Sequence, residues 1–354
     1  MLSRLAGLAT AVTLLTSLLW NAPAGAEERR VRANLAGAFP SSMGILGSAQ
    51  ARVIRLTREM SAGLIDLRYH EPGALMPGSQ YFDAVANGTL DMAFTASGYF
   101  AGKDAALALF TSVPFGPGPG EYLAWFDHGG GNELMREILE PHNVVPINCS
   151  LLAPEAAGWF RNEIKTLDDL KGLRMRILGL GANVMRKFGV ITVQLRSGEI
   201  FQALQLGTID ATEFSLPTLD MALGFYQEAK YYYFPGWHQQ ASIGQLFIAK
   251  AKWAEFSEAQ KSIIITACKA NMLDELSEAE ALQFGAMQDL IAKGVVIKRW
   301  SPEFLQAFEG AWTEVAEEEA ARSASFARVW ASYSKFRAGY AIWRVNGYLG
   351  GGTH

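Results

Sequence analysis

Arg176 is the charged residue of this chain whose setting most clearly requires an ion. It lies in Leu173-Arg-Met-Arg-Ile177, where apolar and charged residues alternate with the period of a half-buried strand. A guanidinium cannot lose its charge, so a partly buried one needs an anion, and its planar fork matches a carboxylate. That anion is either an internal Asp or Glu or a bound ligand, and the spacing favours neither. Arg174 shares the strand face and is expected at its solvated edge.

Two carboxylates, Glu213 and Glu155, are candidate ligands of a cation. Glu213 follows a short apolar strand at its carboxyl end, where open α/β sheets bind ligands. Glu155 lies on a loop just before Gly158-Trp-Phe160. If the two side chains converge, their oxygens suit a hard cation. Taken singly, Glu213 is better explained as a helix N-cap or as half of a salt bridge.

An aromatic segment, Tyr231-Tyr-Tyr-Phe-Pro-Gly-Trp-His238, contains six rings within eight residues. Alternation along a strand would bury half of these rings in a core. The Pro-Gly turn would offer Trp237 and His238 to the wall of a pocket.

The composition argues against several function classes. The 354 residues carry a net charge of −4, so no broad positive surface is expected and nucleic-acid binding is disfavoured. The chain has five histidines and lacks the motifs of P-loop, zinc-protease, thiol-redox and serine-hydrolase sites. Gly179-x-Gly181 lacks the third glycine of a dinucleotide fingerprint and is expected to be a structural turn. A secreted enzyme is therefore disfavoured.

The elements that must position these residues contain a unit that occurs twice. Residues 82–94 and 201–213 are each typical of a helix end, a glycine stop and a short apolar strand. Two similar α/β lobes leave a cleft between them, and the copies differ at their ends, where Phe94 corresponds to Glu213. Asp83, Asp91 and Asp210 flank the glycines of these units and are expected to be turn or cap residues.

The remaining elements follow from periodicity and from turn residues. Strands are predicted at 32–35, 64–69, 144–152, 158–161, 173–177 and 191–195. Helices are predicted at 45–60 and 121–139, and from 253 almost to the end with breaks near 294–297 and 302.

The first 26 residues are typical of a secretory signal peptide. Arg4 is followed by an apolar run to Trp20 and by the small-residue cleavage site Ala24-Gly25-Ala26. The run is shorter than the roughly 20 residues of a spanning helix, so cleavage is favoured over a membrane anchor. The only cysteines, Cys149 and Cys268, have apolar neighbours and are expected to be buried free thiols. Export without a disulfide framework fits a bacterial periplasm.

Taken together, the motifs resemble the extracytoplasmic solute receptors of tripartite ATP-independent periplasmic (TRAP) transporters, the DctP-like superfamily, and most of all the branch that binds 2-oxo acids and lactate. The matching segments run in family order: Phe82-Asp-Ala-Val with Gly88-Thr, Gly102 to Asp104, Leu109 to Gly116, Gly129 to Leu134, Gly158 to Ile164, Leu167 to Ile177, Gly198 to Leu204, Ile209 to Phe214, and Tyr231 to His238.

The resemblance implies an α/β, two-lobed periplasmic binding protein fold with crossing hinge strands and long C-terminal helices. Residues 27–150 with about 241–290 would form lobe I. Residues 151–240 with about 291–354 would form lobe II and the C-terminal helices. Some relatives dimerise through the C-terminal helix. Here 304–343 is long and aromatic enough to do so, and packing on its own lobe is the equal alternative.

The implied function is that of a periplasmic receptor, not an enzyme, which captures a 2-oxo or 2-hydroxy monocarboxylic acid and delivers it to the membrane subunits of a TRAP transporter. The substrate-binding residues would be Arg176, which clamps the carboxylate, and Glu155, Phe214, Tyr99 and Trp237. Two other classes stay open. One is a secreted enzyme with Arg176 as electrophile and Glu213 as base, and the other is a sensory receptor that presents its ligand to a signalling partner.

The resemblance also implies one cation, sodium or calcium, that bridges substrate and protein through Glu155, Glu213, Phe214 and Gln239. Relatives carry Gln where this chain has Glu155 and Glu where it has Gln239. The two ligand types are exchanged, while the number of carboxylates is kept.

Four further positions depart from the family pattern near the expected pocket. Gly98 replaces an aromatic residue, Leu151 and Leu219 each replace Asn, and Phe214 replaces Trp. These exchanges predict a less polar pocket and a ligand with a larger or more apolar tail than pyruvate.

Overall fold

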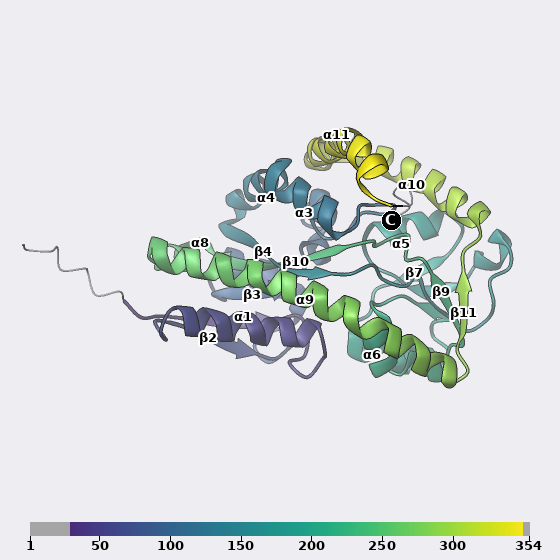
Figure 1. The fold of residues 1–354 in the computed structure, drawn as a ribbon, viewed down its shortest axis with the longest axis horizontal. Coiled ribbons are helices and arrows are strands. Elements are labelled where there is room, and N and C mark those ends of the chain that lie inside the picture. Colours follow the sequence, from purple (N-terminus) through teal and green to yellow (C-terminus); the bar gives the residue numbers. More distant parts are fainter. Residues whose placement is uncertain (1–28, 350–354) are drawn as a thin grey trace, which may run out of the picture.

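Two β-sheets, one in each half of the molecule, organise the computed structural model, which describes residues 29–349 (Figure 1). The first sheet has the order β2-β1-β3-β10-β4. Its strands are β1 (Val31–Gly37), β2 (Ile65–His70), β3 (Met92–Thr95), β4 (Val144–Leu152) and β10 (Ser242–Ala249). Strands β1, β2 and β3 are parallel, whereas β10 runs antiparallel to both β3 and β4. The predicted signal peptide, residues 1–26, lies outside the described residues.

The second sheet has the order β11-β9-β5-β8-β6-β7. Its strands are β5 (Gly158–Phe160), β6 (Arg174–Arg176), β7 (Ile191–Val193), β8 (Ala211–Thr212), β9 (Tyr231–Phe234) and β11 (Val296–Arg299). The predicted break near 294–297 is thus a strand, which pairs in parallel with β9 at the edge of the sheet. We call the half with the first sheet the first lobe and the half with the second sheet the second lobe.

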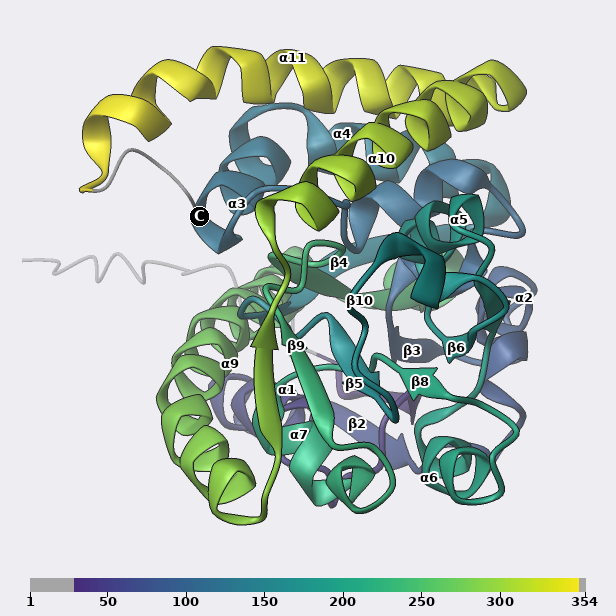
Figure 2. The same ribbon diagram turned by 90° about the vertical axis from the view of Figure 1, so that its right-hand side faces the viewer.

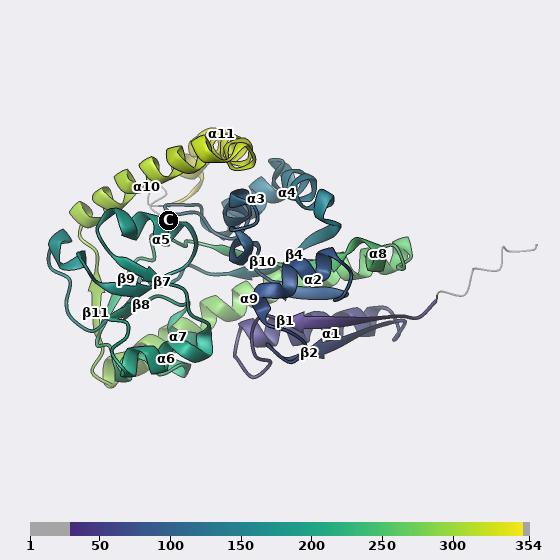
Figure 3. The ribbon, with the colours of Figure 1, turned by 180° about the vertical axis from the view of Figure 1, so that it is seen from behind.

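The helices cover the two sheets and connect the lobes (Figures 1 and 3). They are α1 (Leu46–Met60), α2 (Tyr81–Ala86), α3 (Pro119–His128), α4 (Gly131–Leu139), α5 (Gly179–Lys187), α6 (Ser197–Gln205), α7 (Pro217–Ala222), α8 (Lys250–Trp253), α9 (Glu258–Ala292), α10 (Pro302–Arg322) and α11 (Ala324–Gly347). The long helix α9 packs against α1 and β4 of the first lobe and against α7 of the second. None of the helices described is both long and apolar enough to cross a membrane.

The C-terminal helices lie across both lobes (Figure 2). Helix α10 packs on α5 of the second lobe, and α11 packs on α3, α4 and the 3-10 segment Ala105–Phe110 of the first lobe. Arg337 and Arg344 of α11 both pair with the buried carboxylate of Glu121 in α3. The lobe boundaries predicted from the sequence stay a prediction, but α11 belongs by its contacts to the first lobe.

The repeated unit is present in both lobes. Helix α2 is followed by Gly88 with φ 77° and then by β3, and helix α6 is followed by Gly207 with φ 65° and then by β8. Glycine is needed at both turns because this left-handed conformation is unfavourable for residues with a Cβ. The predicted single helix over 121–139 is instead divided into α3 and α4, because Gly130 takes a φ of 92°.

The expectation of free thiols is wrong: Cys149 and Cys268 form a disulfide, with a Cα–Cα distance of 4.2 Å. Cys149 lies in β4 and Cys268 in α9, and both side chains are fully buried. The two residues are 119 positions apart, so only the packing of α9 on β4 shows that they meet. The disulfide ties the long helix to the first sheet.

Two chain segments cross between the lobes beside each other. Residues 153–157 connect β4 to β5, and residues 235–241 connect β9 to β10. They are hydrogen bonded to each other, because the Gly236 N–H donates to the Glu155 carbonyl (3.0 Å) and the Glu155 N–H donates to the Gln239 carbonyl (3.2 Å). A Cβ at Gly236 would lie 2.2 Å from the Glu155 carbonyl oxygen, so this approach requires glycine.

Candidate functional site

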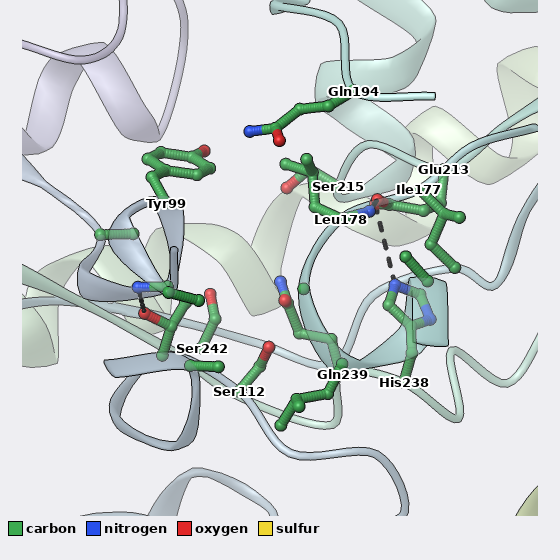
Figure 4. Close-up of a pocket in the computed structure, with 18 of the residues that line it drawn as sticks. Tyr99, Ser112, Ile177, Leu178, Gln194, Glu213, Ser215, His238, Gln239 and Ser242 are labelled. Carbon is green, nitrogen blue, oxygen red and sulfur yellow. Dashed lines mark hydrogen bonds and ion pairs between the residues drawn. The ribbon is translucent and has the colours of Figure 1, made fainter. Parts of the chain in front are cut away.

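A cavity of about 530 Å³ lies between the two lobes, in the size range of small-ligand sites (Figure 4). Residues from both lobes and from both crossing segments line it. It is framed by the ends of the two repeated units, since Phe94 and Glu213 both belong to its lining.

Arg176 is buried at the end of β6, with its side chain 3% exposed. Its Nη1 donates to the Glu213 carbonyl (2.5 Å) and to Glu213 Oε1 (3.0 Å), and its Nε donates to the Leu195 carbonyl (3.3 Å). Its Nη2 makes no hydrogen bond to another described residue. The guanidinium carbon lies 5.5 Å from the centre of the Phe214 ring, a cation–π distance. One arm of the fork is therefore left for a further anion.

Glu213 is brought to Arg176 by strand pairing. In the parallel pair of β6 and β8, Arg176 is opposite Thr212, so Glu213 follows directly beside it. Its Oε1 also accepts a hydrogen bond from the Leu178 N–H (2.8 Å). Burial alone would raise the pKa of Glu213, but the charge of Arg176 and the nearby His238 ring lower it below its ordinary value. The carboxylate is therefore ionised.

Glu155 has a different environment on the first crossing segment. Its Oε1 accepts a hydrogen bond from Ser215 (2.9 Å), whereas its buried Oε2 has no hydrogen-bond partner among the described residues. Burial and the neighbouring Glu213 carboxylate raise the pKa of Glu155 well above its ordinary value. Behind Ser215, Asp220 accepts hydrogen bonds from the Ser215 N–H and from Trp159 and Tyr232. This packing fixes the serine that holds Glu155.

His238, on the second crossing segment, completes a group of three possible metal ligands. One donor atom from each of Glu155, Glu213 and His238 lies within 4.8 Å of the others, and all three residues are buried. His238 Nε2 lies 3.8 Å from Glu213 Oε2 (Figure 4), and neither ring nitrogen has a hydrogen-bond partner among the described residues. Buried polar atoms are rarely left unpaired, so these atoms suit a bound cation.

The structure brings together most of the predicted site residues. The cavity lining includes Arg176, Glu155, Glu213, Phe214, Gln239 and Tyr99. Trp237 lies outside the lining and packs instead on Phe115 and Phe308, with ring centroids 5.7 Å and 5.0 Å away. Arg174 pairs with Asp210 (2.6 Å) and is 43% exposed, as expected for the edge of the strand.

The four departures from the family pattern divide into two pairs. Gly98 and Phe214 line the cavity, whereas Leu151 and Leu219 are core residues outside the lining. A Cβ at Gly98 would lie 3.1 Å from Thr111 Oγ1, to which the Gly98 N–H donates a hydrogen bond. A side chain at this position would therefore require Thr111 to shift by a few tenths of an ångström.

The sequence did not indicate all of the lining residues. His238 was expected at a pocket wall but not as a ligand, and Ser112, Ser215 and Ser242 carried no signal. Ser215 follows Glu213 by two positions, and both residues line the cavity. The other two serines enter the cavity only through the pairing of loops and strands that are far apart in the sequence.

Comparison with known proteins places the chain in a family. Residues 40–323 match the family model described as bacterial extracellular solute-binding protein, family 7. A monocarboxylate 2-oxoacid-binding periplasmic protein of Nostoc sp. (strain PCC 7120) is 35% identical over 344 residues, which cover 96% of this chain and 94% of that protein.

Two solved structures share both the fold and the sequence similarity. A TRAP transporter solute-binding protein of Bordetella bronchiseptica, with calcium and picolinate in one active site of a dimer, has a TM-score of 0.87. A TRAP periplasmic solute-binding protein of Pseudoalteromonas atlantica with bound sodium and pyruvate has a TM-score of 0.86. Each is 30% identical to this chain and aligns with 89% of it, covering 94% and 96% of the respective structures.

Proposed function

The chain belongs to family 7 of the bacterial extracellular solute-binding proteins, the solute receptors of TRAP transporters, and from this premise we propose that it captures a 2-oxo or 2-hydroxy monocarboxylate in the cavity between its lobes. One observation carries the proposal: Arg176 is buried in the cavity wall with Glu213 on one arm of its fork and no partner on Nη2 among the described residues. A ligand carboxylate supplies the missing acceptor.

The similar structures with sodium or calcium support a cation in the same site. Glu155, Glu213 and His238 fit such a cation because their buried donor atoms converge, and the Gln239 side chain lines the same space. When bound, the cation would neutralise charge between protein and ligand. Arg176 and Glu213 cancel, so a monocarboxylate needs one compensating positive charge. If Glu155 is protonated, the single charge of a sodium ion is sufficient. If Glu155 is ionised, a calcium ion is needed, because one of its two charges balances the Glu155 carboxylate.

Capture is expected to couple to closure of the lobes. The carboxylate binds to second-lobe residues, and the rest of the ligand faces the first lobe. A ligand that contacts both lobes stabilises the closed form relative to the open form, because only the closed form makes both sets of contacts. We propose that the ligand is released unchanged to the membrane subunits of the transporter, after export of the chain to the periplasm by its N-terminal signal peptide.

A homodimer through the C-terminal helix stays a prediction. The outward face near the end of α11 exposes Ile342 (74%), Trp343 (57%) and Val345 (59%), which is unusual for a surface that stays in water. Light scattering on the purified protein would give the mass of the particle directly. A monomer at micromolar concentration would contradict the prediction.

A thermal-shift screen of carboxylates, with and without a chelator, tests the proposed function. A ligand at a hundredfold excess over its Kd adds about 2.7 kcal/mol to the free energy of unfolding, which raises the Tm by several degrees. We expect 2-oxo monocarboxylates to give this shift, and the chelator to reduce it if the cation is calcium. No response to any monocarboxylate, with a clear response to a sugar or an amine, would contradict the proposal.

A further inference from the structure

The first lobe contributes hydroxyl groups, rather than charges, to the cavity. Among the described residues that line it, those of the first sheet and its loops include no charged side chain. They do include Ser112, Ser242 and Tyr99, each with a polar group directed into the space (Figure 4).

Ser112 and Ser242 are neighbours in the fold. The Ile243 N–H donates to the Thr111 carbonyl (2.9 Å), so the residues that flank this bond, Ser112 and Ser242, are held close together. Figure 4 shows His238, Gln239 and Ser242 in that order across the cavity, so Ser242 lies on the side of Gln239 away from His238. Tyr99 stands on the same side of the view.

These hydroxyls are available to a ligand. The side chains of Ser112, Ser242 and Tyr99 make no hydrogen bond to another described residue. Ser242 is 7% exposed, Ser112 is half-buried and Tyr99 is 38% exposed, so a ligand that fills the cavity would remove these hydroxyls from water. By contrast, the lining residues Ser150, Ser215 and Thr111 are all engaged, with Glu275, Glu155 and Ser97 respectively. A hydroxyl can donate and accept one hydrogen bond at once, and burying it without a partner is unfavourable.

The same wall argues against a second charge on the ligand. The remaining cation of the lining, Arg186, comes from α5 of the second lobe, is exposed, and already donates to Asn183 (2.9 Å) and Thr192 (3.1 Å). A distal carboxylate that reaches the first-lobe wall would leave water for a surface that has no positive charge among its described residues. A hydrocarbon tail would cover three hydroxyls and leave them unpaired.

We propose that the ligand carries, beyond its carboxylate, a neutral hydrogen-bonding group such as a hydroxyl, which is bound by Ser112, Ser242 and Tyr99. This rests on the proposed function and names the class of its ligand: a monocarboxylate with a polar, uncharged distal end. It departs from the apolar tail predicted from the sequence, because Leu151 and Leu219, on which half of that prediction rests, lie outside the lining.

Three 2-oxo acids that differ only in the distal group test the proposal by calorimetry. The first is 4-methyl-2-oxopentanoate, which has an apolar distal end. The second is 4-hydroxy-2-oxopentanoate, in which a hydroxyl replaces one methyl group of the first. The third is 2-oxoglutarate, which has a distal carboxylate. We expect the hydroxy acid to bind about five- to tenfold more tightly than its methyl counterpart, as one or two neutral hydrogen bonds predict. The acid with two carboxylates is expected to bind most weakly.

Two variants test whether Ser112 and Ser242 cause the preference for the hydroxy acid. In Ser112→Ala/Ser242→Ala the preference for the hydroxy acid should fall below twofold, because this acid loses its hydrogen bonds and the methyl acid no longer covers two unpaired hydroxyls. The methyl acid should bind at least as tightly as it binds to the natural chain, which also shows that the variant is folded. Ser277→Ala, an exposed serine on α9, should leave the preference unchanged.

Equal or tighter binding of the methyl acid by the natural chain would overturn the proposal, and so would a preference that survives in the double variant. Both results leave the receptor function intact, since a 2-oxo acid still binds. Failure of all three acids, together with pyruvate, would instead contradict the proposed function itself.

Discussion

The wall that the second lobe contributes to the cavity carries Arg176 and Glu213, and the crossing segments beside it carry Glu155 and His238. The wall from the first lobe carries only neutral side chains among the described residues. The repeated unit makes the difference plain. Its copy in the first lobe ends in β3 with Phe94, and its copy in the second lobe is followed by Glu213 after β8. One scaffold is thus used twice, once to build an apolar edge and once to build a charged one.

The contrast teaches how recognition is divided between the lobes. Charged groups attract a carboxylate of any kind, so we expect the second-lobe wall to select for the presence of an acid. Neutral hydroxyls and apolar groups discriminate by shape and by single hydrogen bonds, so we expect the first-lobe wall to select among acids. The predictions below test this division, from the largest expected effect to the smallest.

Removing the guanidinium should abolish binding. In Arg176→Gln we expect the affinity for a 2-oxo monocarboxylate to fall more than a hundredfold, about 3 kcal/mol or more, because a charged hydrogen bond in a buried site is lost. Calorimetry measures the loss. Arg174→Gln on the same strand is the matched control, since Arg174 is partly exposed and pairs with Asp210, and it should bind as the natural chain does.

The variant also leaves the Glu213 carboxylate buried without its cationic partner, which is destabilising. Arg176→Gln/Glu213→Gln removes both charges and should recover the stability but not the binding. If the single variant, once shown to be folded, bound the acid within tenfold of the natural affinity, the charged wall would not be the carboxylate site.

A buried acid, Glu275, lies behind the neutral wall. Glu275 of α9 accepts hydrogen bonds from Ser150 Oγ and from the Leu151 N–H, both 3.0 Å, behind the first-lobe lining. Burial raises its pKa to about 8. Between pH 4.5 and 8 the folded chain holds a proton that the unfolded chain has lost, so the free energy of unfolding should decrease as the pH rises through this window.

Replacing Glu275 with glutamine mimics the protonated acid at every pH. We expect Glu275→Gln to make the decrease between pH 5 and 8 shallower, by on the order of 2 kcal/mol in the free energy of unfolding. Urea unfolding at several pH values measures it. Glu280→Gln, at an exposed position of the same helix, should keep the natural slope, and an unchanged slope in Glu275→Gln would show that the acid is ionised behind the wall.

Much of the scaffold could be predicted from the sequence because its signals are local. Strand β4 has the predicted bounds of 144–152, and α1 begins one residue later than predicted. The prediction failed where the structure depends on contacts between residues far apart in the sequence. Strand β11 is a strand because it pairs with β9. Cys149 and Cys268 form a disulfide because α9 packs on β4.

The site was predictable in its residue types and less so in its arrangement. Arg176 was recognised because alternation placed a charge in an apolar strand, and Glu213 because a carboxylate followed a strand end. That they are each other's partner follows from the register of β6 and β8, which the sequence does not show. Glu155 and His238 meet because two crossing segments about 80 positions apart are hydrogen bonded.

Exchanging Glu155 and Gln239, the two predicted cation ligands whose types are exchanged relative to the family pattern, should change the affinity for the cation. In Glu155→Gln we expect the affinity for calcium to fall about tenfold, because one carboxylate ligand is replaced by an amide. In Glu155→Gln/Gln239→Glu the carboxylate returns on the other crossing segment, and the affinity should recover to within about threefold. Calcium titration of the chelator-treated protein measures both. If both variants bound calcium as the natural chain does, Glu155 would not be a ligand.

The smallest effect is expected at the ring that packs on Arg176. Phe214 lies 5.5 Å from the guanidinium carbon, and a cation–π contact of this kind contributes about 1 kcal/mol. Phe214→Leu keeps an apolar side chain but removes the ring face, so Arg176 should be held less firmly and the affinity for the acid should fall about threefold to fivefold. Phe234→Leu, a half-buried aromatic residue of β9 outside the cavity lining, is the control and should leave the affinity unchanged.

Because the ring acts through the arginine, the preference between the hydroxy and methyl acids should be the same in Phe214→Leu as in the natural chain. A changed preference would mean that the second lobe also selects the distal group, and the division between the two walls would be lost.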